Sequence, residues 1–348
     1  MTHLRVPAVD ISSWVGDGSP QDRAQVAAAL DAACRTVGFV QVHGHGIPTA
    51  TIDGLAAAMD EFFALPREVK DAYRTPPEVN RGYTPPKAES LSLSLGVEQA
   101  QRMNDFFEAF NVGVTAADHP SLDLPLPAYA PNVWPVELTG FEPRVRAYFD
   151  EAARVARTLT RIFARALDQA DDFFTRVTDH SADVLRMNHY ALPPGEAVEL
   201  DGRLRGMGEH TDYGIVTVLW ADQVPGLQVL GTDGAWHEVL PEDGALLVNL
   251  GDLTARWTNE AWQSTLHRVA PPVVEGTIRR RRSAAYFHDG NVEAVVEAIG
   301  TCVPLGERAT YPPITVGEHI AAKLAGSRSG VANTAAARDA ARVRAAGR

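Results

Sequence analysis

The chain has 348 residues, of which 45% are hydrophobic and 22% are charged, and its formal net charge is −12. This length supplies one large domain or two small ones with a sizeable core. The acidic balance argues against a sequence-independent grip on nucleic acid. Only two cysteines are present, too few for a disulfide framework, and with no signal-peptide core or long apolar run we expect a cytoplasmic protein without a membrane partner.

Short strands and amphipathic helices alternate in the first part of the chain. We expect strands at 6–11 and 39–42 and helices at 19–37 and 49–64. Ser19 is a favourable N-cap, Pro20 suits the first helical position, and Gly38 ends the helix. Residues 75–100 are rich in Pro, Ser and Leu and predict a long loop, of the kind that often covers a site.

The middle of the chain carries a strand and the longest helix. Residues 105–112 read as a strand whose phenylalanines, Phe106, Phe107 and Phe110, either belong to the core or line a pocket. Residues 141–170 have apolar side chains at helical spacing and predict a long helix that supports a sheet. A shorter helix is expected near 171–177.

The second half is rich in strand signals. We expect strands at 184–190, 227–230, 236–239, 244–250, 265–269 and 277–287, with a chain turn at 251–252. Short strands with regular turns predict a jelly roll, a double-stranded β-helix, with flanking helices. The expected organisation is one structural unit, with an N-terminal region (1–135), a catalytic core (136–320) and a basic, frayed or disordered tail (326–348).

A candidate metal site centres on the segment 208–214, in which His210 and Asp212 are two residues apart. In an extended chain, residues i and i+2 point to the same face, so both side chains can reach one point. His267, in a strand-like stretch, is the third candidate ligand. Two histidines and one carboxylate leave other metal positions open, which is typical of non-haem Fe(II) oxygenases.

A candidate carboxylate anchor follows. Arg281 and Ser283 share one face of the 277–287 stretch, and a guanidinium beside a hydroxyl suits bidentate binding of a carboxylate. Arg280 and Arg282 should face the opposite way. This combination resembles the isopenicillin N synthase-like family of 2-oxoglutarate- and iron-dependent dioxygenases. The resemblance covers most of the chain and rests on an ordered series of short segments: 6–10, 38–47, 62–70, 81–83, 132–135, 186–190, 210–212, 267–269 and 281–283.

The resemblance implies roles for further residues. Tyr190 and Asn188 would help Arg281 and Ser283 to hold 2-oxoglutarate, whose decarboxylation is coupled to C–H oxidation of a substrate. Fe(II), 2-oxoglutarate and O₂ are then required, with ascorbate as an optional addition. Residues near the substrate would include Tyr213, Phe287 and Asp289.

The segments around Asp212 and Phe287 look most like bacterial members of the family. Two departures from the family pattern stand out: a long gap between His267 and Arg281, and Glu260 where a glycine usually follows Asn259.

Three functions remain open from the sequence. The first is a 2-oxoglutarate-dependent oxygenase acting on a small molecule, such as an amino acid or specialised metabolite, by hydroxylation, desaturation or cyclisation. The second is an Fe(II) oxidase of the same fold that does without 2-oxoglutarate, and the third is a non-catalytic binding jelly roll. We expect a monomer that binds no nucleic acid.

Overall fold

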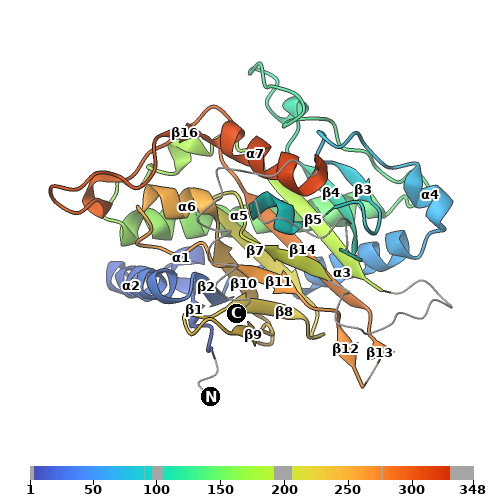
Figure 1. Ribbon diagram of the computed structural model, residues 1–348, viewed down its shortest axis with the longest axis horizontal. Coiled ribbons are helices and arrows are strands. Elements are labelled where there is room, and N and C mark those ends of the chain that lie inside the picture. Colours follow the sequence, from blue (N-terminus) through green and yellow to red (C-terminus); the bar gives the residue numbers. More distant parts are fainter. Residues whose placement is uncertain (1–3, 90, 96–104, 192–205, 276, 330–348) are drawn as a thin grey trace.

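The computed structural model describes residues 4–89, 91–95, 105–191, 206–275 and 277–329. Two sheets form its centre (Figure 1). The large sheet has eight strands, in the order β1 (Ala8–Asp10), β2 (Phe39–His43), β10 (Leu246–Leu250), β7 (Val216–Ala221), β14 (Arg281–His288), β5 (Val184–Tyr190), β4 (Glu108–Gly113) and β3 (Gly82–Thr84). The smaller sheet has the order β6 (Met207–His210), β11 (His267–Val269), β8 (Leu227–Leu230) and β9 (Trp236–Glu238).

Both sheets are antiparallel, except for the parallel pair β1 and β2. Two short ribbons complete the strands: β12 (Val273–Val274) with β13 (Thr277–Ile278), and β15 (Val295–Val296) with β16 (Ile314–Thr315). The first ribbon fills the long gap between β11 and β14 that was noted as a departure from the family pattern. Asn259 and Glu260 both have positive φ angles, of 49° and 66°, a conformation that favours glycine.

The helices are α1 (Ser12–Val15), α2 (Pro20–Thr36), α3 (Thr49–Phe63), α4 (Arg67–Asp71), α5 (Phe141–Ala166), α6 (Asp252–Trp257) and α7 (Val316–Ser329). The long α5 packs against α2, α3 and the large sheet, as predicted. Ser19 caps α2 through a reciprocal bond with Asp22. Among the described residues, no helix is both long and apolar enough to cross a membrane.

Several expected elements differ from the structure. The predicted loop 75–100 contains β3 and a 3₁₀ helix, η1 (Leu91–Leu95). The helix expected at 171–177 is reduced to a single 3₁₀ turn, η3 (Thr175–Val177), while further turns occupy η2 (Ala116–Asp118) and η4 (Gly300–Cys302). The turn expected at 251–252 is instead the start of α6. The predicted tail begins inside α7, whose last turn includes 326–329, and its remaining residues lie outside the described part.

Two clusters of buried side chains hold these layers together. The larger lies between the large sheet and α2, α3 and α5 and includes Phe110. The smaller includes Phe39, Phe106 and Phe107, together with Tyr190 and residues from both sheets. The three phenylalanines therefore belong to the core, which decides between the two interpretations that the sequence left open.

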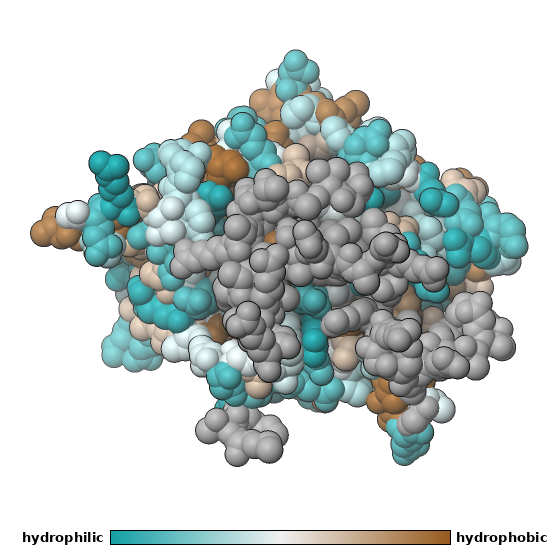
Figure 2. Space-filling model, viewed as in Figure 1, coloured by the Kyte–Doolittle hydropathy of each residue, from teal (hydrophilic) through white to brown (hydrophobic). Residues whose placement is uncertain are grey.

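On the face that Figure 2 shows, hydrophilic residues are interspersed with hydrophobic ones. The most exposed large apolar side chains, Leu126, Val136 and Leu305, come from separate segments, and scattered exposure of this kind is normal for globular proteins.

Strand register decides which side chains face the space between the sheets. In β14 and β5, Arg281 pairs with Tyr190, Ser283 with Asn188, and Ala285 with Arg186. Because successive side chains alternate, these six residues share one face and line one pocket. The residues between them, such as Tyr286 and Met187, join the helix-covered core.

Candidate active site

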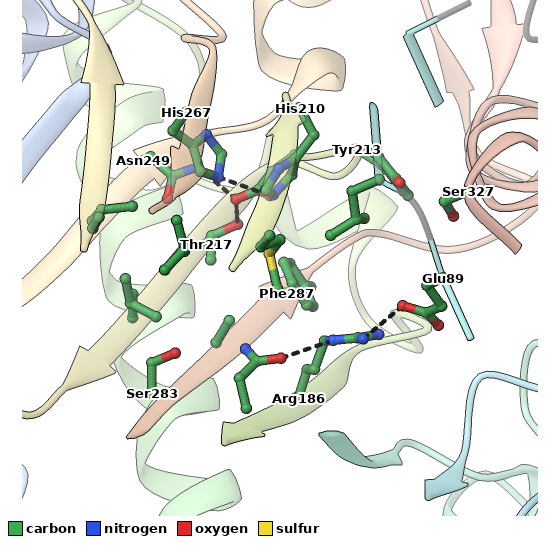
Figure 3. Close-up of a pocket in the computed structure, with 18 of the residues that line it drawn as sticks. Glu89, Arg186, His210, Tyr213, Thr217, Asn249, His267, Ser283, Phe287 and Ser327 are labelled. Atoms are coloured by element: carbon green, nitrogen blue, oxygen red, sulfur yellow. Dashed lines mark hydrogen bonds and ion pairs between the residues drawn. The ribbon is translucent and has the colours of Figure 1, made fainter. Parts of the chain in front are cut away.

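Three side chains from two strands and a loop converge within one pocket (Figure 3). His210 ends β6 and lies opposite His267 of β11, while Asp212 stands in the loop just after β6. Asp212 Oδ1 is 3.8 Å from His210 Nε2 and 3.6 Å from His267 Nε2. One ligand atom from each residue lies within 4.8 Å of the others, and all three residues are buried. The expectation of a shared strand is corrected, because cross-strand pairing and a loop bring the set together.

Hydrogen bonds orient each member of this set. The Nδ1 atoms of His210 and His267 lie 2.8 and 3.0 Å from the carbonyl oxygens of Gly208 and Thr265. With Nδ1–H donating to these acceptors, each Nε2 lone pair faces the centre. Burial and the neighbouring His267 lower the pKa of His210, which favours the neutral imidazole that metals require.

Two hydrogen bonds also orient the carboxylate of Asp212. Asp212 Oδ2 accepts bonds from Thr217 Oγ1 at 2.5 Å and Asn249 Nδ2 at 2.6 Å. These two bonds leave Oδ1 directed at the histidines. The donor set of two neutral nitrogens and one carboxylate oxygen fits a divalent iron with open positions.

A buried arginine that pairs with no acid among the described residues lines the same pocket. Arg281 is 2% exposed, and its Nη1 donates to Ser283 Oγ at 3.3 Å. Its Cζ lies 5.2 Å from the ring centre of Tyr190, and its Nε has no hydrogen-bond partner. By contrast, Arg280 and Arg282 both pair with Asp60 on α3. A buried cation without a carboxylate is costly, so the site fits an acidic ligand.

The pocket extends to both sides of the converging set. It is lined by Asn188, Tyr190, Arg281 and Ser283 on one side. The residues predicted to lie near a substrate, Tyr213, Phe287 and Asp289, also line it. In Figure 3, Ser283 lies on one side of Phe287, while Tyr213, Glu89 and Ser327 lie on the other.

Comparisons with known proteins agree with this geometry. Residues 6–137 match the family model for the non-haem dioxygenase N-terminal domain named for morphine synthesis, and residues 181–290 match that of the 2OG-Fe(II) oxygenase superfamily. The 2-oxoglutarate-Fe(II) type oxidoreductase hxnY of Emericella nidulans is 33% identical over 317 residues, covering 89% of this chain and 86% of its own. The chain belongs to the 2OG-Fe(II) oxygenase superfamily.

Two further proteins are similar along most of their length. Validamycin A dioxygenase of Streptomyces hygroscopicus subsp. limoneus is 32% identical over 91% of this chain and 85% of its own. A full-length Neurospora crassa protein, crystallised in complex with alpha-KG and thymine, superposes with a TM-score of 0.80 at 29% identity, covering 93% of this chain and 97% of its own. The predicted jelly roll, the predicted family and the oxygenase interpretation are thereby confirmed.

This superfamily member is therefore an oxidoreductase that uses Fe(II), 2-oxoglutarate and O₂ on a small molecule. Of the three functions left open by the sequence, the first stands. The bacterial likeness stays a prediction.

Several pocket residues of this oxygenase escaped the sequence analysis. Thr217 and Asn249, which hold Asp212, come from β7 and β10 and share no motif with it. Arg186 could have been assigned to the pocket, because it alternates with Asn188 and Tyr190 on β5. Other pocket residues come from the predicted loop or from α7, without any local signal: Asn80, Glu89, Leu91, Ile320, Leu324, Ser327 and Arg328.

Proposed function

We propose that His210, Asp212 and His267 hold the Fe(II) of this oxygenase and that Arg281 and Ser283 anchor the far carboxylate of 2-oxoglutarate. Tyr190 and Asn188 complete the co-substrate side. The observation that carries the proposal is Arg281, a buried guanidinium that lines the pocket of the His–Asp–His set and pairs with no described carboxylate. The bound iron would supply the oxidising chemistry that couples 2-oxoglutarate decarboxylation to attack on a C–H bond.

The chain's own residues bind, orient and exclude water. Thr217 and Asn249 hold Oδ2 of Asp212, so one oxygen remains for the metal. Burial raises the pKa of Tyr190 to about 12, so its hydroxyl stays protonated and can donate to a carboxylate. Phe39, which packs edge-on against His267 with ring centres 5.4 Å apart, closes one side of the site with apolar surface.

The test is an anaerobic titration of Fe(II) followed by 2-oxoglutarate, reading the weak visible charge-transfer band of the chelate. Loss of one partner of a buried charge pair costs about 2–5 kcal/mol. Arg281→Ala should therefore need at least about 30-fold more 2-oxoglutarate to reach the same band. Arg280→Ala, which removes an exposed neighbouring guanidinium, is the matched control and should behave as wild type.

Two outcomes would contradict the assignment. Unchanged 2-oxoglutarate binding in Arg281→Ala would remove the anchor role. Unimpaired Fe(II) binding after loss of any one of the three ligand side chains would remove the metal role. Calorimetry of 2-oxoglutarate binding gives a second readout that does not depend on turnover.

The remaining features are inferences as well. We infer a monomeric, cytoplasmic enzyme acting on a small molecule such as an amino acid or specialised metabolite, and sedimentation in solution would test the monomer. We also infer that 1–135 and 136–320 form one unit. Strands β1 to β4 of the first region lie in the same sheet as β5, β7, β10 and β14 of the second. This shared sheet supports a single structural unit.

A further inference from the structure

The wall of the pocket on the side away from Ser283 contains a buried ion triad. Glu89 accepts from Arg186 Nη2 at 2.6 Å through one oxygen and from Arg328 Nε at 2.9 Å through the other. The three side chains are 5–10% exposed. They come from β5, the segment before η1 and the end of α7 (Figure 3 shows Arg186 and Glu89). All three line the pocket.

The triad carries an excess positive charge. Burial raises the pKa of Glu89, but Arg186 and Arg328 lower it by more, so the net shift is downward. The carboxylate is therefore ionised at neutral pH, and one negative charge is shared by two permanent cations. Asp289, another acid that lines the pocket, has its pKa raised well above the ordinary range by burial and by neighbouring acids.

The two arginines differ in the donors they have left. Arg328 is occupied: Nε binds Glu89, Nη1 binds the carbonyl oxygen of Pro77, and Nη2 binds Asn80 Oδ1 at 2.5 Å. Arg186 uses Nε on Asn188 Oδ1 and Nη2 on Glu89. Its Nη1 donates to no described residue. Arg186 thus retains donors from both terminal nitrogens, which is the pair needed for a bidentate grip on a carboxylate.

The orientation of Arg186 is fixed before any ligand arrives. Asn188 and Glu89 hold two edges of the guanidinium, and the ring of Phe107 lies 5.0 Å from its Cζ. A donor whose plane is already set loses less entropy on binding than a free side chain. Tyr213, Phe287, Ile320 and Leu324 contribute apolar or aromatic surface to the same pocket.

We propose that the primary substrate is a small organic carboxylate with an apolar or aromatic body, and that Arg186 binds its carboxylate group. Glu89 and Arg328 are positioning residues that hold the guanidinium in place. The body would then lie against Phe287 and Tyr213, toward the His–Asp–His set. The inference rests on the proposed function, because it needs the other arginine, Arg281, to be occupied by 2-oxoglutarate.

The experiment uses the full chain with Fe(II) and saturating 2-oxoglutarate under anaerobic conditions. The probes are matched pairs of carboxylic acids and their primary amides, on aromatic and on aliphatic rings. Affinity is measured by calorimetry and by the shift of the charge-transfer band. Because a charge-assisted contact is about twice as strong as a neutral one, at least one acid should bind about tenfold or more tighter than its amide.

The variants separate binding from folding. Arg186→Gln leaves Glu89 paired with Arg328, so no charge is left buried and alone. This variant should keep the 2-oxoglutarate band and lose the preference for acids. Arg176→Gln, at an exposed pair with Asp172, is the matched control and should keep it.

The failures of the two proposals are distinguishable. A missing 2-oxoglutarate band in wild type overturns the assigned function. With the band intact, equal binding of acids and amides overturns the carboxylate inference, as does an acid preference that survives in Arg186→Gln. An acid preference that is kept in Arg176→Gln and lost in Arg186→Gln supports it.

Discussion

A buried lysine helps to hold α7 over the pocket, and Lys323→Met should expose its contribution. Lys323 is 2% exposed, and its Nζ lies 2.7 Å from Asp252 Oδ2 and 3.0 Å from Thr211 Oγ1. Thr211 stands between the proposed ligands His210 and Asp212. The lysine therefore ties the C-terminal helix to the segment that carries the metal site.

The expected loss of stability depends on the contacts that Asp252 keeps in the variant. Breaking a buried ion pair by removing one partner costs about 3–5 kcal/mol. Asp252 retains a hydroxyl bond from Ser264 at 2.7 Å and the imidazole of His319 at 3.3 Å, so we place the loss near the lower end, at about 3 kcal/mol. At roughly 2 °C per kcal/mol for a large domain, the melting temperature should fall by about 6 °C.

The assay is urea unfolding at neutral pH, with Lys87→Met as the control at an exposed lysine. Adding Asp252→Asn to Lys323→Met should recover part of the loss, because no unpaired charge then remains. A loss below about 1 kcal/mol, or a double variant that is no more stable than Lys323→Met alone, would refute the reasoning. Fe(II) affinity should fall together with stability, since Thr211 loses its contact.

Three further predictions concern the site and its walls. Asp212→Ala should lower the Fe(II) affinity by more than about 100-fold, beyond the loss typical of residues that only orient a ligand, as measured by equilibrium dialysis. Glu89→Gln should lower the free energy of unfolding. The lost stability is fully present above the ordinary pKa of 4.5 and vanishes as pH falls through the lower pKa of Glu89 in the folded protein. Parallel urea unfolding curves of wild type and variant from pH 7 to 3 give the sign. Gly251→Ala should destabilise the fold by about 1–3 kcal/mol, because a Cβ there would lie 2.1 Å from the carbonyl oxygen of Gly214, and unchanged denaturant midpoints would contradict this.

The sequence predicted best the features that local chemistry determines. Arg281 and Ser283 stand two residues apart on one strand, so their shared face could be inferred from period 2 alone. The helix at 20–36 was equally predictable, because Ser19 and Gly38 mark its ends.

Features that depend on distant pairing could not be predicted in the same way. Glu89 and Arg328 are 239 residues apart and meet only because α7 folds back over the pocket. The apolar residues of α7 do not form a single stripe, so its sequence has weak helical periodicity. Asn249 sits in a buried strand, where an amide gives no hint that it holds Asp212.

The register of β5 and β14 sets a fixed spacing inside the pocket. Arg281 and Ala285, which lies opposite Arg186, are four residues apart on one strand, a span of about 13 Å at the usual rise. The two proposed anchors, Arg186 and Arg281, are therefore held at a fixed separation by the paired strands. Substitutions at Ala285 or Phe287 can change the width of the pocket, but the distance between the two arginines stays the same. In a substrate bound at Arg186 through its carboxylate, the length of the substrate's carbon chain would determine which carbon lies at the metal site and reacts.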